Sequence, residues 1–383
     1  MLTDEHEALR NAVAKFARDE IAPVIAGYYA NHTFPYDVVA AMGSMGLFGL
    51  PFPVESGGMG GDFTALGIAI EELARVDSSV AITLEAGVCL GAMPIYRYGS
   101  AEQKATWLPR LLSGQALAAF GLTEPDSGSD AAALRTRAVL DEASGEWVIN
   151  GTKAFITNSG TDITELVTVA AVTGEHDGRP EISTILVPAG TPGLTVSPGY
   201  DKVGWCASDT HELSFVDVRV PAANLLGERG KGLAQFLRTL DEGRVAIAAL
   251  ATGLAQGCVD ESVAYARRRV AFGRPIGSFQ AIGFTIADME ARAHTARLAW
   301  HDAADRLVRG VEFKRAAAIA KLTASDTAVA NARAATQIHG GYGFITETPV
   351  ARFWRDAKIL EIGEGTSEVQ RMIIARDLGL SLT

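Results

Sequence analysis

Apolar positions recur at helical spacing in the first and last parts of the chain and form short β-rich runs between them. Near the N-terminus, Leu9, Val13, Phe16 and Ala17 fall on one face of an amphipathic helix. The same spacing predicts further helices over residues 36–45, 66–76, 84–96 and 101–112. We therefore expect an N-terminal α-helical domain over residues 1–117.

The pattern changes over residues 118–229. Short runs rich in β-formers occur at 146–151, 166–172, 183–187, 194–196 and 212–218. Asn150-Gly151 is typical of a hairpin turn. Because no long helices separate these runs, an antiparallel sandwich or barrel is expected rather than a doubly wound parallel sheet.

Long helical periodicity returns over residues 230–383, in segments 233–269, 281–308, 312–339 and 349–360. Long helices with short connections predict an antiparallel, four-helix-bundle-like C-terminal domain. The expected fold is thus mainly α with a central antiparallel β domain.

The segment near the C-terminus contains a break between two predicted helices. Thr348-Pro349 is typical of a helix start, and one apolar stripe is predicted at Val350, Phe353, Trp354, Ala357 and Leu360. Ser367 and Gln370 fit a capping box that opens the last helix. Between the helices lies Gly363-Glu364-Gly365, where flanking glycines allow unusual backbone dihedrals and close approach of a ligand. Taken alone, Glu364 also fits a carboxylate that compensates a helix dipole.

Composition narrows the class of protein. The net charge of −11 argues against a general nucleic-acid binder. The three cysteines are scattered without C-x-x-C spacing, which suits a reducing compartment and predicts no metal cluster. No signal or transit pattern is apparent in residues 1–30, and the longest uncharged apolar run, 245–259, is shorter than the roughly 18 residues of a membrane span. We expect a cytoplasmic protein without a membrane partner.

The segment Gly363-Glu-Gly-Thr-Ser-Glu-Val-Gln-Arg371, preceded by Arg355-Asp-Ala-Lys358, resembles the C-terminal signature of the acyl-CoA dehydrogenases. The resemblance implies an FAD-dependent oxidoreductase of fatty-acid β-oxidation that converts an acyl-CoA to the trans-2-enoyl-CoA. Glu364 would abstract the α-proton while hydride passes to flavin N5. Gly365 would contact the substrate, and Thr366 and Glu368 the cofactor.

Two further segments match the family's flavin site. Phe120-Gly-Leu-Thr-Glu-Pro-Asp-Ser-Gly-Ser-Asp130 is on its own an ordinary Pro/Gly/Ser turn with free hydroxyl and N–H groups. The resemblance places Phe120, Leu122 and Thr123 against the isoalloxazine and Gly128 and Ser129 near the pyrophosphate, with Ser129 also near the acyl-CoA. It places Phe155, Ile156 and Thr157 behind the flavin, although many members carry Trp where this chain has Phe155.

The stretch Leu240–Val245 resembles the family's substrate-binding helix, with contacts at Asp241, Gly243 and Arg244. In the isovaleryl and long-chain branches the base lies immediately before that arginine, where this chain has Gly243. Glu242 lies one residue earlier, about 100° around a helix, and is the alternative candidate for the base. The glycine points toward the short- or medium-chain branches.

Two last segments resemble those that reach the FAD of a neighbouring subunit. They contribute Arg269, Phe272 and Gln280 from one segment and Gln337, Gly340 and Gly341 from the other. His339 is expected to be structural. The resemblance therefore implies a homo-oligomer, with a tetramer built as a dimer of dimers.

The resemblance also implies an electron-transfer flavoprotein as partner. An acyl-CoA oxidase that uses oxygen, and a catalytically silent acyl-CoA-binding scaffold, stay open as alternatives. The acyl group is not determined: Gly363 stands where many relatives carry Tyr, and the stretch 78–93 lacks the arginine that a dicarboxylate would need. Glu85 is an unexplained acid in that stretch.

Overall fold

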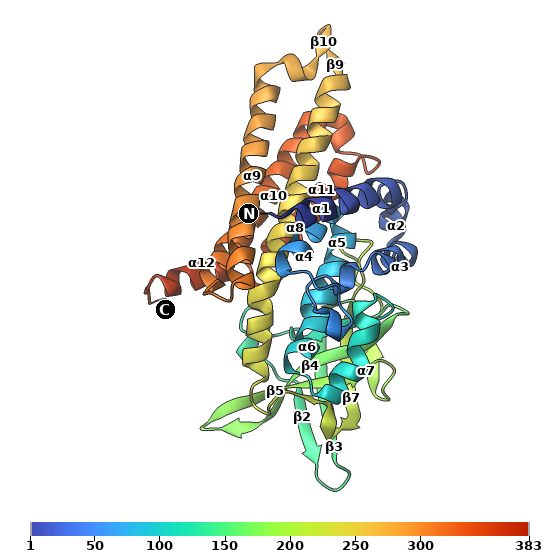
Figure 1. Cartoon of the computed structure of the whole chain (residues 1–383), viewed down its shortest axis with the longest axis vertical. Coiled ribbons are helices and arrows are strands. Elements are labelled where there is room, and N and C mark those ends of the chain that lie inside the picture. Colours follow the sequence, from blue (N-terminus) through green and yellow to red (C-terminus); the bar gives the residue numbers. More distant parts are fainter. Residues whose placement is uncertain (1, 382–383) are drawn as a thin grey trace.

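The computed structural model describes residues 2–381 of the 383-residue chain. An N-terminal helical region, a β domain and long C-terminal helices follow one another, as predicted (Figure 1). The β domain lies at one end of the molecule, and the hairpin that joins the two longest helices projects from the other end.

The N-terminal region comprises seven α-helices: α1 (Asp4–Phe16), α2 (Ile25–Asn31), α3 (Tyr36–Ser44), α4 (Phe63–Ala74), α5 (Ser78–Glu85), α6 (Met93–Tyr98) and α7 (Ala101–Leu112). A π-helical segment, η4 (Ala86–Ala92), joins α5 to α6. The continuous helical stretch Ser78–Tyr98 is long and apolar enough to cross a membrane, but 94% of its apolar window is buried inside the protein. It therefore serves as a core helix here.

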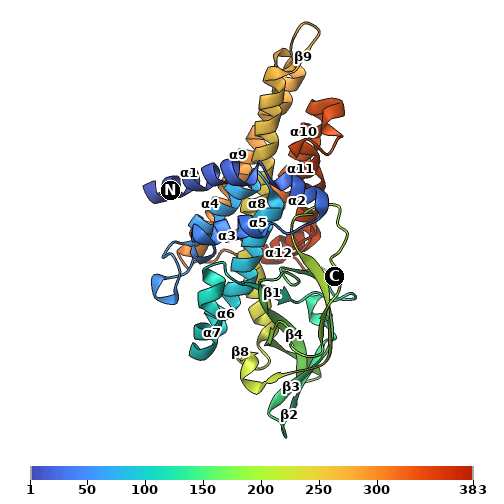
Figure 2. The ribbon, with the colours of Figure 1, turned by 90° about the vertical axis from the view of Figure 1, so that its right-hand side faces the viewer.

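The β domain is one eight-stranded sheet with the path β6-β7-β3-β2-β4-β5-β8, and β1 pairs with β4. Its strands are β1 (Leu117–Gly121), β2 (Arg137–Asp141), β3 (Glu146–Thr157), β4 (Thr164–His176), β5 (Arg179–Pro188), β6 (Leu194–Val196), β7 (Thr210–Pro221) and β8 (Leu225–Leu226). The sheet is mostly antiparallel as expected, but β1 and β2 run parallel to β4. It lies beside the N-terminal half of the long helix α8 (Gly232–Arg268) (Figure 2).

The hairpin prediction at Asn150-Gly151 is wrong. These residues lie inside β3, where the pairing with β7 shifts register between Ile149 and Gly151. The Asn150 side chain exchanges two hydrogen bonds with Asp217. A Cβ on Gly151 would lie 2.5 Å from the Thr136 hydroxyl oxygen. The glycine thus allows close strand contact at a bulge rather than a turn.

The C-terminal region comprises α8 (Gly232–Arg268), α9 (Gln280–Val308), α10 (Lys314–His339), α11 (Pro349–Ala357) and α12 (Ser367–Asp377). The short strands β9 (Val270–Ala271) and β10 (Arg274–Pro275) form the projecting hairpin between α8 and α9. The apolar run 245–259 is buried in the middle of α8.

Two details near the C-terminus differ from the predictions. Trp354 is 56% exposed, whereas the other members of its predicted stripe are buried, because position 354 lies on the solvent side of α11. The cap of α12 is Thr366 rather than Ser367, since the Thr366 hydroxyl accepts a hydrogen bond from the Val369 N–H at 3.2 Å. Gln370 instead donates to the Gly365 carbonyl oxygen at 2.8 Å.

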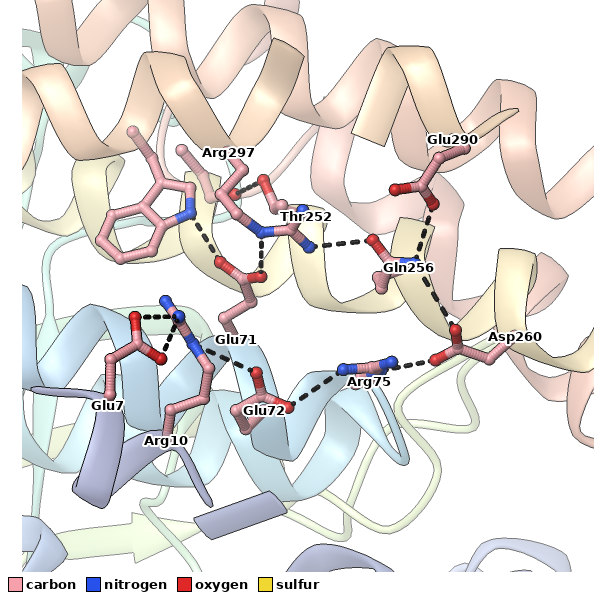
Figure 3. A network of polar contacts seen from close by, with 12 residues as sticks. Glu7, Arg10, Glu71, Glu72, Arg75, Thr252, Gln256, Asp260, Glu290 and Arg297 are labelled. Atoms are coloured by element: carbon pink, nitrogen blue, oxygen red, sulfur yellow. Dashed lines mark hydrogen bonds and ion pairs between the residues drawn. The ribbon is translucent and has the colours of Figure 1, made fainter. Parts of the chain in front are cut away.

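A polar network fastens α4 to its neighbouring helices (Figure 3). The Glu71 carboxylate accepts hydrogen bonds from Arg297 Nε at 2.6 Å and Trp300 Nε1 at 2.8 Å, both on α9. Glu72 forms ion pairs with Arg10 of α1 at 3.6 Å and with Arg75 at 3.5 Å. Each of these buried carboxylates is therefore compensated by cationic or N–H groups from the surrounding helices.

Candidate active site

The bend Gly363-Glu364-Gly365 lies between a short 3-10 turn, η9 (Lys358–Glu361), and α12. Glu364 has φ of +52° and Gly365 has φ of +93°. A non-glycine residue in the left-handed region is strained and persists only where its surroundings hold it. Here the Gly365 carbonyl oxygen accepts hydrogen bonds from Lys321 Nζ at 2.9 Å and from Gln370. The bend is thus held by α10 on one side and by α12 on the other.

The Glu364 side chain points into the protein. Both carboxylate oxygens are buried, and neither has a hydrogen-bond donor among residues 2–381. A Cβ built on Gly243 of α8 would lie only 2.1 Å from Glu364 Oε2. Position 243 must therefore be glycine for the carboxylate to lie where it does.

Two buried cations face this carboxylate. Lys321 of α10 is fully buried, and burial lowers its pKa to about 8. Arg244 of α8 is 4% exposed. Burial raises the pKa of Glu364, whereas Glu85, Lys321 and Arg244 oppose that increase. The site thus stabilises a carboxylate while keeping water away from it.

The two acids that precede Gly243 on α8 are paired with arginines. Asp241 forms an ion pair with Arg244. Glu242 accepts hydrogen bonds from Arg97 at 2.8 Å and from Arg238 at 3.1 Å. Since Glu242 is already paired with two arginines, its geometry favours a structural role over that of a base.

The two predicted flavin segments lie side by side in the β domain. The Thr123 carbonyl oxygen accepts a hydrogen bond from the Ala154 N–H at 2.9 Å. Buried Lys153 of β3 donates to the Leu122 carbonyl oxygen at 3.1 Å and to the Glu124 carboxylate at 2.8 Å. A buried ion pair therefore fixes the loop after β1 against β3.

This pair of segments presents both aromatic and polar groups. Phe155 is 63% exposed, adopts φ of +59° and packs against Tyr200 with ring centroids 5.0 Å apart. The Phe120 ring contacts Phe236 of α8, with centroids 4.2 Å apart. Leu122 is buried and Thr123 and Thr157 are half-buried, whereas Gly128 and Ser129 are exposed in the loop. The Ile156 side chain lies in the core of the β domain, so it does not face the surface on which Phe155 is exposed.

The two segments predicted to serve a neighbouring subunit also lie together, at the far end of α8. Arg269, Gly340 and Gly341 line an open cavity of about 510 Å³. Phe272 in the hairpin is 94% exposed, and Gln280 and Gln337 are exposed at the start of α9 and near the end of α10. His339 stacks on Tyr265 with ring centroids 4.2 Å apart and is bonded to the Ala335 carbonyl oxygen, which agrees with a structural role.

Close to the bend, the cap residue Thr366 is half-buried and Glu368 is exposed. Two other residues at the site were not assigned from the sequence. Lys321 gave no signal, because a lysine in a helical segment is usually exposed to solvent. Glu85 gave a weak signal, as the only acid in the otherwise uncharged stretch 78–93. In the structure it is fully buried and faces Glu364.

Three families of protein domain match the chain in sequence. They are described as acyl-CoA dehydrogenase N-terminal domain (residues 3–115), middle domain (residues 119–218) and C-terminal domain (residues 230–379). Together they cover nearly the whole chain.

Individual proteins match over their full length. A Bacillus subtilis (strain 168) protein named "Probable acyl-CoA dehydrogenase YngJ" is 49% identical, with 98% of each chain covered. The solved structure of butyryl-CoA dehydrogenase from Megasphaera elsdenii is 40% identical and has a TM-score of 0.95, with 99% of each chain covered. A solved structure concerning the electron transferring flavoprotein of Acidaminococcus fermentans contains a chain that is also 40% identical, with a TM-score of 0.95. The match covers 99% of the present chain and 98% of that chain.

Proposed function

The chain belongs to the acyl-CoA dehydrogenase family and is therefore an oxidoreductase, and from this premise we propose that Glu364 removes the α-proton of a bound acyl-CoA. The observation that carries this proposal is the direction of its side chain. Both oxygens lie in the interior, against Gly243, with no donor among the described residues to neutralise them. A carboxylate in this position is available to accept a proton.

The surroundings of Glu364 suit this role. An α-proton beside a thioester is only weakly acidic, so the developing negative charge on the thioester oxygen needs hydrogen-bond donors. We expect the backbone N–H of Glu364 to be one of them. Burial raises the pKa of the carboxyl toward working pH, which makes it a stronger base than a free glutamate. The positive charges of Lys321 and Arg244 limit this increase in pKa, so that a fraction of Glu364 is ionised and can accept the α-proton.

Family membership implies FAD, and the residues present fit it. The exposed Phe155 ring, the half-buried hydroxyls of Thr123 and Thr157 and the polar Gly128-Ser129 turn offer a flat aromatic face beside hydroxyl and N–H donors. When bound there, FAD supplies the acceptor for the substrate's β-hydrogen as hydride. We propose Phe120, Leu122, Thr123, Gly128, Ser129, Phe155, Ile156, Thr157, Thr366 and Glu368 as contacts within one subunit.

The length of α8 supports a homo-oligomer. Gly243, beside Glu364, and Arg269, in the open cavity, are 26 residues apart on this helix and its end. At 1.5 Å per residue the separation is about 39 Å, too far for one dinucleotide to reach. We therefore propose that Arg269, Phe272, Gln280, Gln337, Gly340 and Gly341 serve the FAD of a neighbouring subunit.

The substrate and the electron acceptor are also proposals. Asp241, Gly243, Arg244, Ser129 and Gly365 are the expected substrate contacts, and the similarity to butyryl-CoA dehydrogenase favours a short acyl chain. The similarity to a chain in the Acidaminococcus fermentans structure supports an electron-transfer flavoprotein as partner.

The test is Glu364→Gln, which keeps the size of the side chain but removes the base. The variant should bind FAD and butyryl-CoA, while anaerobic bleaching of the flavin by butyryl-CoA should slow by about a thousandfold or more. Glu142→Gln is the matched control, because Glu142 is exposed in the turn between β2 and β3. A Glu364→Gln variant that bleaches at the wild-type rate would refute the assignment.

A further inference from the structure

Glu85 is a buried acid that the proposed mechanism does not use. It ends α5, and the π-helical segment η4 begins at the next residue. Its side chain is fully buried, and neither carboxylate oxygen has a hydrogen-bond donor in the part of the chain that the structure describes. A buried acid without a donor is costly and points to a specific use.

The two unpaired carboxyls converge on one point of α8. A Cβ on Gly243 would lie 2.1 Å from Glu364 Oε2 and 3.6 Å from Glu85 Oε1. The two oxygens are therefore no more than 5.7 Å apart, the sum of these distances. The carboxyls are within hydrogen-bonding reach of each other. Two carboxylates this close in a dry site cannot both ionise, so the pair shares one proton at neutral pH.

The charges around the pair decide which member holds that proton. Lys321 from α10 and Arg244 from α8 both act on Glu364. No cation among the described residues acts on Glu85 in this way: besides Glu364, the Cys89 thiol of η4 acts on it and partly lowers its pKa. Burial, followed by the charge of Glu364, raises the pKa of Glu85 well above its ordinary value. The cations thus favour the ionised form of Glu364 and leave the proton on Glu85.

The remaining charged groups nearby do not change this assignment. Glu242 acts on Cys89 but is paired with Arg97 and Arg238. Asp241 is paired with Arg244. Glu361 and Asp326 act on Lys321.

We propose that Glu85 is a positioning residue for the base: as a neutral carboxylic acid it donates a hydrogen bond to Glu364 and keeps that carboxylate ionised and aimed at the substrate. The inference rests on the proposed role of Glu364. During the reaction the α-proton passes to Glu364, while the proton of Glu85 is neither consumed nor released.

Two substitutions separate the hydrogen bond from the titratable proton. Glu85→Gln retains a neutral donor of the same length, and Glu85→Met removes the donor at similar volume. The measurement is the pH dependence of anaerobic flavin bleaching by butyryl-CoA in the FAD-loaded enzyme. We expect Glu85→Gln to resemble the wild type. Glu85→Met should move the midpoint upward by at least about one pH unit and slow bleaching about tenfold below it, because Glu364 loses a donor that favours its charged form.

Thr83→Val is the matched control, because Thr83 is a buried α5 residue whose hydroxyl bonds only to the Ser79 carbonyl oxygen at 3.1 Å. Its pH profile should equal that of the wild type. A Glu85→Met variant with a wild-type pH profile overturns the proposal, as does one that changes only the preference among acyl chains.

A second readout does not depend on turnover. Infrared spectroscopy should show the C=O stretch of a buried protonated carboxylic acid in the wild type and in Glu364→Gln, and its loss in Glu85→Gln. Loss in Glu364→Gln instead would place the proton on Glu364 and overturn the assignment. The two proposals fail separately: turnover by Glu364→Gln refutes the base, whereas an inactive Glu364→Gln with an unperturbed Glu85→Met refutes only the role of Glu85.

Discussion

Two pairs of buried glutamates in this molecule differ in how they are compensated. Glu71 and Glu72 on α4 are surrounded by arginines and a tryptophan N–H in the network of Figure 3. The carboxylate oxygens of Glu85 and Glu364 are buried as well, but no hydrogen bond from residues 2–381 reaches them, although Lys321 and Arg244 face Glu364.

The difference separates a structural use of a carboxylate from a chemical one. A buried carboxylate that is paired with cations holds helices in place, and its lone pairs are occupied. A buried carboxylate without such partners costs stability, and it retains the basicity that proton abstraction requires. The first pair therefore fastens the helices, and the second forms the site at which we place the base.

Among the variants that test this comparison, Gly243→Ala should have the largest effect. The added methyl group would lie 2.1 Å from Glu364 Oε2 and displace the unpaired carboxylate. Butyryl-CoA-dependent bleaching should slow about a hundredfold, since small misplacements of a catalytic group are costly. Gly27→Ala is the control, because nothing lies within 4 Å of a Cβ at that exposed helical position. Wild-type activity in Gly243→Ala would show that the observed position of the carboxylate is not the one used.

Removing a paired glutamate and an unpaired one should affect stability in different ways. Glu71→Met leaves Arg297 and buried Trp300 without their acceptor and should lower the free energy of unfolding by about 3 kcal/mol. Glu85→Met removes a buried acid that pairs with no cation among the described residues, and should lower it by clearly less than Glu71→Met does. The free energy of unfolding of both variants is measured by urea unfolding. Glu7→Ala is the control, because Glu7 is exposed, and it should change the free energy by less than about 0.5 kcal/mol. Equal losses in both methionine variants would contradict the comparison.

Asp356 is intermediate between the two pairs, because hydrogen-bond donors but no ion pair among the described residues compensate its buried carboxylate. It should have a smaller, pH-dependent effect on stability. It accepts hydrogen bonds from Tyr29 at 2.5 Å, Ser78 at 2.7 Å and the Trp205 N–H at 2.7 Å, but burial and then the charge of Asp77 raise its pKa to about 6. Because the folded protein binds this proton more tightly than the unfolded chain, the contribution of Asp356 to stability falls as pH rises from about 4 through about 6.

Asp356→Asn should remove that part of the pH dependence. The measurement is the thermal unfolding midpoint between pH 4 and pH 8, compared with the wild type. If the unfolding midpoint of the variant depends on pH as it does in the wild type, other groups determine that dependence.

Much of the architecture was predictable because its signals are local. Helical periodicity and β-rich runs depend on neighbouring residues, so they were sufficient for the order of helical, β and helical regions. The glycines around Glu364 likewise marked a bend within three residues of sequence. Local signals misled where neighbouring strands or helices decided the outcome. Asn150-Gly151 became a bulge because β2 and β7 pair on either side of β3, and Trp354 fell outside the buried face of α11.

The sequence alone determined which residue types were present for chemistry: an acid between two glycines, an isolated acid in an apolar stretch, and a glycine before an arginine. Only the tertiary structure decided that Glu364, Glu85, Gly243 and Lys321 meet at one point. These four residues come from four different segments far apart in the chain. Their contact depends on how α5, α8 and α10 pack, and the charge that each side chain carries depends on the burial and neighbours that this packing creates.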